Sequence, residues 1–145
     1  QRTPAVSNRG QDFFQNKRKD FLTLPPQDEI LLQLLFDKLE ENWHNAEFDI
    51  KDYCKATAMS TSQLYRNTIS LTGLSPNILL KEFRLEKAKE LMKKQRYNIA
   101  QITFDSGFTS ASYFTKCFKK KYGLLPMAYL VAFKVGIKVG KGVCI

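Results

Sequence analysis

The chain has 145 residues, of which 43% are hydrophobic and 12% aromatic, enough apolar material for one folded domain with tails. No apolar run reaches the about 18–20 residues of a membrane-spanning helix, and the N-terminal stretch lacks the apolar segment of a secretory signal peptide. Three scattered cysteines and one histidine argue against a disulfide framework and a zinc site. We expect free thiols in a reducing cytoplasm, with no metal and no other cofactor.

The net charge of +9 is unevenly distributed along the chain. Residues 1–47 carry 6 basic and 8 acidic residues, whereas residues 48–130 carry 14 basic and 6 acidic ones. The segment with the strongest helical pattern is therefore also the basic one. This distribution is typical of a protein that binds a polyanion, although charge alone does not identify the polyanion.

Hydrophobic periodicity and capping residues predict an all-α fold, with no pair of strands between residues 28 and 130. Residues 1–27 mix proline with polar residues and are interpreted as a linker. A first helix is expected over residues 28–43, with acidic residues in its first turn. The apolar residues that follow its i, i+4 spacing are Ile30, Leu31, Leu34, Leu35 and Leu39.

The next helices are marked by their capping residues. One is expected from its N-cap Asp49 to about Thr57, and another from its N-cap Ser60 to Gly73. In the second of them, the residues spaced for burial are Leu64, Thr68 or Ile69, and Leu71.

Ser75 followed by a proline predicts the start of a helix of about 20 residues. Asn98 then caps a short helix, a helix with lysines and aromatics follows over residues 110–122, and a last short helix covers residues 125–130. Residues 131–145 alternate apolar residues with Lys and Gly, as an edge strand does, but no partner strand is evident. We interpret them as a tail that is disordered or was added for expression.

The chain repeats itself at an offset of 49–50 residues, with one extra residue in the second copy. Arg66 corresponds to Lys116, and Gly73 to Gly123. Each copy reads as a short helix, a turn, an N-cap and a longer helix, which is the layout of a helix-turn-helix. Two copies are too few for a helical solenoid.

The helix expected between the two copies is about as long as the spacing between adjacent major grooves of DNA. About 20 residues at about 1.5 Å each span about 30 Å. Successive major-groove faces of B-DNA lie about 34 Å apart. A rigid helix of that length can set two recognition helices into adjacent major grooves of one duplex.

Four runs of fixed spacing cover most of residues 48–130. They are Met59-Ser60-x-Ser62-x-Leu64-Tyr65-Arg66, Thr72-Gly73-Leu74-Ser75-Pro76, Arg84-Leu85-x-x-Ala88-x-x-Leu91 and Ile102-x-x-x-x-Gly107-Phe108-x-Ser110-x-Ser112-Tyr113-Phe114-x-x-x-Phe118-Lys119-x-x-Tyr122-Gly123-x-x-Pro126. These runs resemble the tandem helix-turn-helix DNA-binding domain of the AraC/XylS class of bacterial transcription regulators. The first recognition segment also resembles versions found at the C-terminus of hybrid two-component sensor-regulators, where a membrane sensor, a kinase and a receiver precede it.

The resemblance implies a cytoplasmic DNA-binding output domain that is not an enzyme and holds no small-molecule ligand in this chain. Double-stranded DNA is its expected partner, and RNA polymerase and a second copy of the chain are further candidates. The implied organisation is a linker at 1–27, a first helix-turn-helix subdomain at 28–74, a linker helix at 75–96, a second subdomain at 97–130 and a tail at 131–145.

Three residues depart from the family pattern. Ala58 stands where the family usually has a turn glycine, so a positive φ there would cost about 1 kcal/mol. Thr68 occupies a normally apolar position and predicts looser packing of the first recognition helix. Leu125 replaces a serine cap before Pro126 and weakens the start of the last helix.

The residues opposite the buried faces are the expected DNA contacts. Arg66 can bond guanine bidentately, and the resemblance assigns base contacts to Ser112 and Lys116. The full set of expected base contacts is Ser62, Tyr65, Arg66, Ser112 and Lys116. The expected phosphate contacts, at helix N-termini and along the end of the second recognition helix, are Ser60, Thr109, Ser110, Lys119, Lys120 and Lys121.

Three other functions are compatible with parts of the sequence. The helix at 28–43 can pair with another chain through Ile30, Leu31, Leu34 and Leu35. The basic amphipathic helix over 110–122 can lie on a membrane surface, and charge alone also fits RNA. An enzyme is least favoured, because no nucleophile–His pair, phosphate loop or carboxylate dyad is present.

Overall fold

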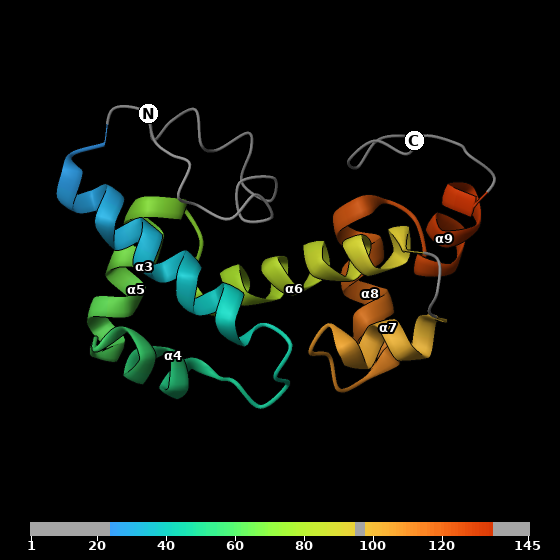
Figure 1. Cartoon of the computed structure of the whole chain (residues 1–145), viewed down its shortest axis with the longest axis horizontal. Coiled ribbons are helices and arrows are strands. Elements are labelled where there is room, and N and C mark those ends of the chain that lie inside the picture. The colour runs from blue at the N-terminus through green and yellow to red at the C-terminus, as the bar shows by residue number, and fades with distance from the viewer. Residues whose placement is uncertain (1–23, 95–97, 135–145) are drawn as a thin grey trace. The chain divides into compact units, whose positions relative to one another are not determined.

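The computed structural model describes residues 24–94 and 98–134 (Figure 1). Within these residues the protein is entirely helical, without a strand, which confirms the all-α fold class. The helices are α3 (Pro26–Asn42), α4 (Ile50–Thr57), α5 (Thr61–Thr72), α6 (Pro76–Lys93), α7 (Ile99–Asp105), α8 (Ala111–Tyr122) and α9 (Pro126–Lys134).

The chain divides into two compact units, each with its own hydrophobic core. Of the described residues, the first unit contains 24–43 and 48–83, and the second contains 44–47, 84–94 and 98–134. Helix α6 supplies residues to both cores, since its first half belongs to the first unit and its second half to the second.

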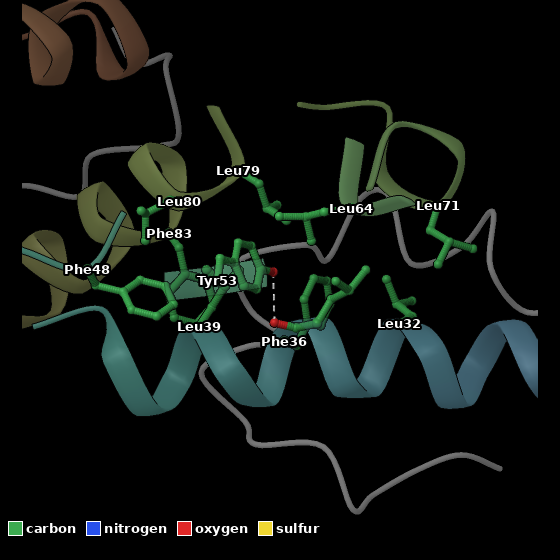
Figure 2. Close-up of a cluster of buried hydrophobic side chains, with 11 residues drawn as sticks. Leu32, Phe36, Leu39, Phe48, Tyr53, Leu64, Leu71, Leu79, Leu80 and Phe83 are labelled. Atoms are coloured by element: carbon green, nitrogen blue, oxygen red, sulfur yellow. Dashed lines mark hydrogen bonds between the residues drawn. The ribbon is translucent and has the colours of Figure 1, made fainter. Parts of the chain in front are cut away.

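In the first unit, α3, α4, α5 and the start of α6 enclose one core (Figure 2). Tyr53 on α4 is fully buried, and its hydroxyl donates a hydrogen bond to the Leu35 carbonyl of α3 at 3.0 Å. Leu64 of α5 and Leu79 of α6 are also fully buried. The hydroxyl–carbonyl bond ties α4 to α3, and the apolar contacts bring α5 and α6 onto the same core.

Only some of the residues in the i, i+4 pattern of α3 are buried. Leu32, Leu35, Phe36 and Leu39 are buried, whereas Ile30 is 71% exposed and Leu34 only half-buried. The apolar run over residues 30–36 fits more than one helical face, so the contacts with α4 and α5 decide which face is buried. The i, i+4 spacing predicted the helix but did not identify which of its apolar residues are buried.

In the second unit, aromatic side chains of α8 form the centre of the core. The Phe118 ring centroid lies 4.6 Å from that of Tyr122 and 5.6 Å from that of Tyr129, and the Tyr122 hydroxyl donates to a Glu86 carboxylate oxygen at 2.8 Å. These contacts occupy the apolar side of α8, so the buried Phe114, Phe118 and Tyr122 are not available to a membrane surface. None of the described helices is long and apolar enough to cross a membrane.

The N-caps agree with the sequence analysis. Asp49 accepts from the Asp52 backbone N–H, Ser60 from that of Gln63, and Asn98 from that of Gln101. Two helix ends differ from the expected bounds. Helix α3 begins at Pro26, inside the segment interpreted as linker, and α9 continues to Lys134, four residues into the segment interpreted as tail. The rest of that tail lies outside the described residues.

The turn between α4 and α5 places Ala58 in the left-handed region, with φ 59° and ψ 37°. It is the one described non-glycine residue with a positive φ, and Gly107, at the equivalent turn of the second copy, has φ 90°. The condition under which the sequence analysis expected strain at Ala58, a positive φ, is therefore met. An alanine Cβ in this conformation is strained, so the first turn is less stable than a glycine would make it.

Ala58→Gly is expected to raise the free energy of unfolding by about 0.5–1 kcal/mol, because it removes the Cβ strain at a positive φ. Gly123→Ala is the matched control: Gly123 has φ +80° and an added Cβ would meet no atom within 4 Å. That variant should lose about 1 kcal/mol from the backbone alone. Urea midpoints measure both effects, and a lower midpoint for Ala58→Gly would contradict the strain.

Tyr53→Phe is expected to cost about 1 kcal/mol of stability near neutral pH, because it removes the buried hydroxyl that bonds Leu35. Burial raises the pKa of Tyr53 above its ordinary value of 10.0. Above that pH the unfolded chain releases the proton while the folded chain retains it, so the wild type loses stability that the variant keeps. The difference between the two should shrink by about 1.4 kcal/mol per pH unit.

Chemical denaturation of the wild type and Tyr53→Phe at neutral pH and at about pH 10.5 compares the two differences. A difference that stays constant across this range would mean that Tyr53 ionises as readily in the folded protein as in the unfolded chain.

Candidate nucleic-acid interface

Helix α5 presents Ser62 and Arg66 to solvent. A capping box fixes its start: the Ser60 hydroxyl accepts from the Gln63 backbone N–H at 3.1 Å, and the Gln63 side chain accepts from the Ser60 N–H at 2.9 Å. Leu64 then faces the core, so Ser62 and Arg66, one turn apart, share the exposed face. Neither side chain bonds to another described residue, which leaves the Arg66 guanidinium available for an outside acceptor.

Tyr65 lies differently from its neighbours. It is half-buried, and its hydroxyl accepts a hydrogen bond from the side-chain amide of Asn77, in the first turn of α6, at 3.1 Å. Sequence reasoning missed Asn77, because a contact across 12 residues between two helices leaves no periodic signal.

Of the two residues expected to be buried further along α5, Thr68 is fully buried, and its hydroxyl donates to the Tyr65 carbonyl. Ile69, an alternative to Thr68 for burial, is 51% exposed.

Helix α8 repeats the arrangement of α5. Its N-cap is Ser110, whose hydroxyl accepts from the Tyr113 backbone N–H at 3.2 Å, and Phe114 faces the core. Ser112 and Lys116 are exposed at the same positions relative to the cap as Ser62 and Arg66. The extra residue of the second copy therefore falls before the cap, and Thr109 precedes the helix as an exposed residue.

The end of α8 is cationic. Lys119 and Lys120 are exposed, while Lys121 is half-buried with its ammonium 5.4 Å from the centroid of the Tyr122 ring. Lysines in a last turn also stabilise the helix through its dipole, so the charge has a structural use as well. The equivalent positions on α5 include Ile69 and Ser70, and α5 has no basic residue in its last turn.

Tyr113 is an exposed aromatic that the list of expected contacts did not include. It is 52% exposed on the first turn of α8, and its ring centroid lies 6.2 Å from that of the buried Phe108. An aromatic residue next to Phe114 looks like a core residue in the sequence. The exposure of Tyr113 follows from the position of the Ser110 cap, which puts Phe114 rather than Tyr113 toward the core.

Metal chemistry has no evident site in the described part of the chain, where no group of three or more His, Cys, Asp or Glu side chains can hold an ion. The two polar faces of α5 and α8 are instead suited to hydrogen bonding and to contact with negative charge. Two copies of a short helix, a turn and a capped helix with such a face define a tandem helix-turn-helix protein.

Comparison with known proteins gives the family. A family model described as a helix-turn-helix domain matches residues 53–131. The chain is 34% identical over 108 residues to histidine kinase P4 of Formosa agariphila. The aligned region covers 74% of this chain and 8% of that protein. It is also 34% identical over 99 residues to the HTH-type transcriptional regulator MtrA of Neisseria gonorrhoeae. That alignment covers 68% of this chain and 31% of the regulator.

A solved structure shows the same fold. The DNA-binding domain of AdpA, described as a global transcriptional factor in complex with a target DNA, is 27% identical with a TM-score of 0.66 and covers 72% of this chain and 93% of that chain. The chain belongs to the AraC/XylS family of helix-turn-helix DNA-binding domains. It is a DNA-binding domain of the kind found in transcription regulators, its partner is double-stranded DNA, and it is not an enzyme.

Lys119→Ala and Lys120→Ala are each expected to weaken DNA binding to a similar extent on every duplex tested. Each should also reduce, by about 1, the magnitude of the slope of the logarithm of the association constant against the logarithm of the salt concentration. The reason is that each phosphate contact releases a counterion. Fluorescence anisotropy over a salt series measures both quantities. Lys134→Ala, at the end of α9, is the control and should leave the slope unchanged; an equal change in the control would remove the special role of the α8 lysines.

Proposed function

We propose that the chain is a sequence-specific DNA-binding module that inserts α5 and α8 into adjacent major grooves of one duplex. The observation that carries the proposal is the repeated exposed pair, Ser62 with Arg66 and Ser112 with Lys116, set at the same distance from a serine N-cap. Both pairs combine a hydroxyl with a cation one turn away, which suits contact with the edges of bases. The basic end of α8 supplies phosphate contacts through Lys119, Lys120 and Lys121, with Ser60, Thr109 and Ser110 at the helix starts.

The proposed organisation places α6 as the connection between two recognition units. A helix of 18 residues rises about 27 Å at about 1.5 Å per residue, which is comparable to the about 34 Å between successive major-groove faces. One chain then covers two neighbouring groove segments with different side chains. A non-palindromic binding site follows, because Arg66 and Lys116 do not present the same donors.

We also propose that this module is the output domain of a longer, signal-responsive regulator on the cytoplasmic side of the membrane. Support comes from histidine kinase P4, of which the chain matches only 8%, and from the resemblance of the α5 segment to hybrid sensor-regulators. RNA polymerase and a second copy of the chain remain proposed partners. Of the four residues suggested for an α3 interface, Leu35 is fully buried in its own core and Ile30 is largely exposed.

Selection of bound duplexes from a random library tests the tandem arrangement. Two enriched blocks centred about one helical turn apart are expected. One block, or none, would mean that only one recognition helix reads DNA or that binding is not sequence-specific.

Arg66→Ala and Lys116→Ala are expected to cost about 1–3 kcal/mol of binding free energy each, because each removes a cation that donates to base acceptors. Each variant should relax the preference in a different enriched block. Repeating the selection with both variants and with Lys134→Ala measures this. If both variants bind the selected duplex as tightly and selectively as the parent, the groove assignment is wrong.

A further inference from the structure

A hydrogen bond joins the first recognition helix to the helix that follows it. The Asn77 side-chain amide, in the first turn of α6, donates to the Tyr65 hydroxyl on α5 at 3.1 Å. Both residues belong to the first unit, and Asn77 is exposed. The bond is thus a surface feature beside the exposed face that carries Ser62 and Arg66, and the core does not require it.

The direction of this bond determines what the Tyr65 hydroxyl can do next. An amide NH₂ group only donates, so the phenol oxygen is the acceptor and its own proton is left for another partner. The amide comes from a side chain anchored on a neighbouring helix, so it restricts the rotation of the Tyr65 side chain before any ligand arrives. A donor restricted in this way loses less conformational freedom on binding.

We propose that Asn77 is a positioning residue that holds the Tyr65 hydroxyl so that it donates its proton to a phosphate oxygen of the DNA strand beside α5. The inference rests on the proposed function, since it takes α5 as a recognition helix. Tyr65 is half-buried and lies between the core side and the exposed side of α5. A residue on the flank of a recognition helix meets the sugar-phosphate backbone, whereas the exposed pair meets the bases.

The two recognition helices differ in a way that makes this contact useful. Helix α8 ends in Lys119, Lys120 and Lys121, but the last turn of α5 has no basic residue. A donor fixed beside α5 supplies the phosphate contact that the α8 lysines supply in the second unit. In the second copy, the residues at the positions of Tyr65 and Asn77 are Thr115 and Met127, and a methionine has no proton to donate.

A double-mutant cycle tests the proposal. Tyr65→Phe, Asn77→Ala and the double variant are compared with the parent on a fluorescent duplex enriched by selection and on duplexes with single base-pair changes. Tyr65→Phe should bind about 5–10-fold more weakly, because it removes a hydrogen bond to a charged group, and Asn77→Ala about threefold more weakly. The double variant should bind like Tyr65→Phe alone, because Asn77 acts only through the hydroxyl.

The readout on mismatched duplexes separates phosphate contact from base reading. The loss in Tyr65→Phe should be equal on selected and mismatched duplexes. Met127→Ala, the control at the matching position of α9, is 58% exposed in the parent and should leave affinity unchanged. Circular dichroism and urea midpoints establish that every variant is folded under the binding conditions.

Three outcomes would overturn the proposal: an Asn77→Ala variant that binds like the parent, losses that add in the double variant, or a loss confined to the selected duplex. The second outcome would mean that Asn77 contacts DNA itself, and the third that Tyr65 reads a base. Arg66→Ala, measured in parallel, distinguishes a failure of the positioning role of Asn77 from a failure of the proposed function. If Arg66→Ala binds more weakly while the cycle shows no coupling, the groove assignment stands and only the positioning role fails.

Discussion

The position of a serine N-cap determines which residues of each recognition helix face outward. In α5 and α8 the cap carbonyl accepts the backbone N–H of the fourth residue along, Leu64 or Phe114, and that residue is fully buried. The residues two and six places after the cap are then exposed. Because the cap and the first buried side chain are set by backbone bonding and by packing, the exposed polar pair has no other face to occupy. This constraint places two pairs of side chains on the surface: Ser62 with Arg66, and Ser112 with Lys116.

The two copies share this frame but differ in the turn that precedes it. The first turn uses Ala58 at a positive φ, and the second uses Gly107 with an additional residue before the cap. The surfaces that follow differ as well, since α8 ends in three lysines and α5 in none. The two copies thus share the capped-helix frame but differ in backbone strain and in charge. The two halves are expected to contribute unequally to affinity at different salt concentrations.

Much of the fold was predictable, because its signals are local. The caps at Asp49, Ser60 and Asn98 depend on residues close in sequence and were predicted from them. The buried face of α3 was not, since its continuous apolar run allows several faces and only distant contacts choose among them. The extent of α9 to Lys134 was likewise missed, because α9 lacks a polar face that would mark its period.

The candidate site divides along the same line. Exposure of Arg66 and Lys116 follows from counting along one helix, so the sequence was sufficient for it. The Asn77–Tyr65 hydrogen bond joins two helices through side chains, and no residue pattern in either helix predicts it. Tyr113 was overlooked for a related reason: whether an aromatic residue is core or surface depends on a cap position that the sequence placed only to within one residue.

Helix α6 has a consequence for how the domain unfolds. Leu79, Leu80 and Phe83 belong to the first core, while Leu85, Ala88 and Met92 belong to the second. Each half of α6 packs on one core, and a helical segment of about nine residues is marginal in water once its packing partner is lost. The loss of either core therefore withdraws support from the helix on which the other is built. We expect the shared helix to couple the melting of the two halves, even though each has a hydrophobic core of its own.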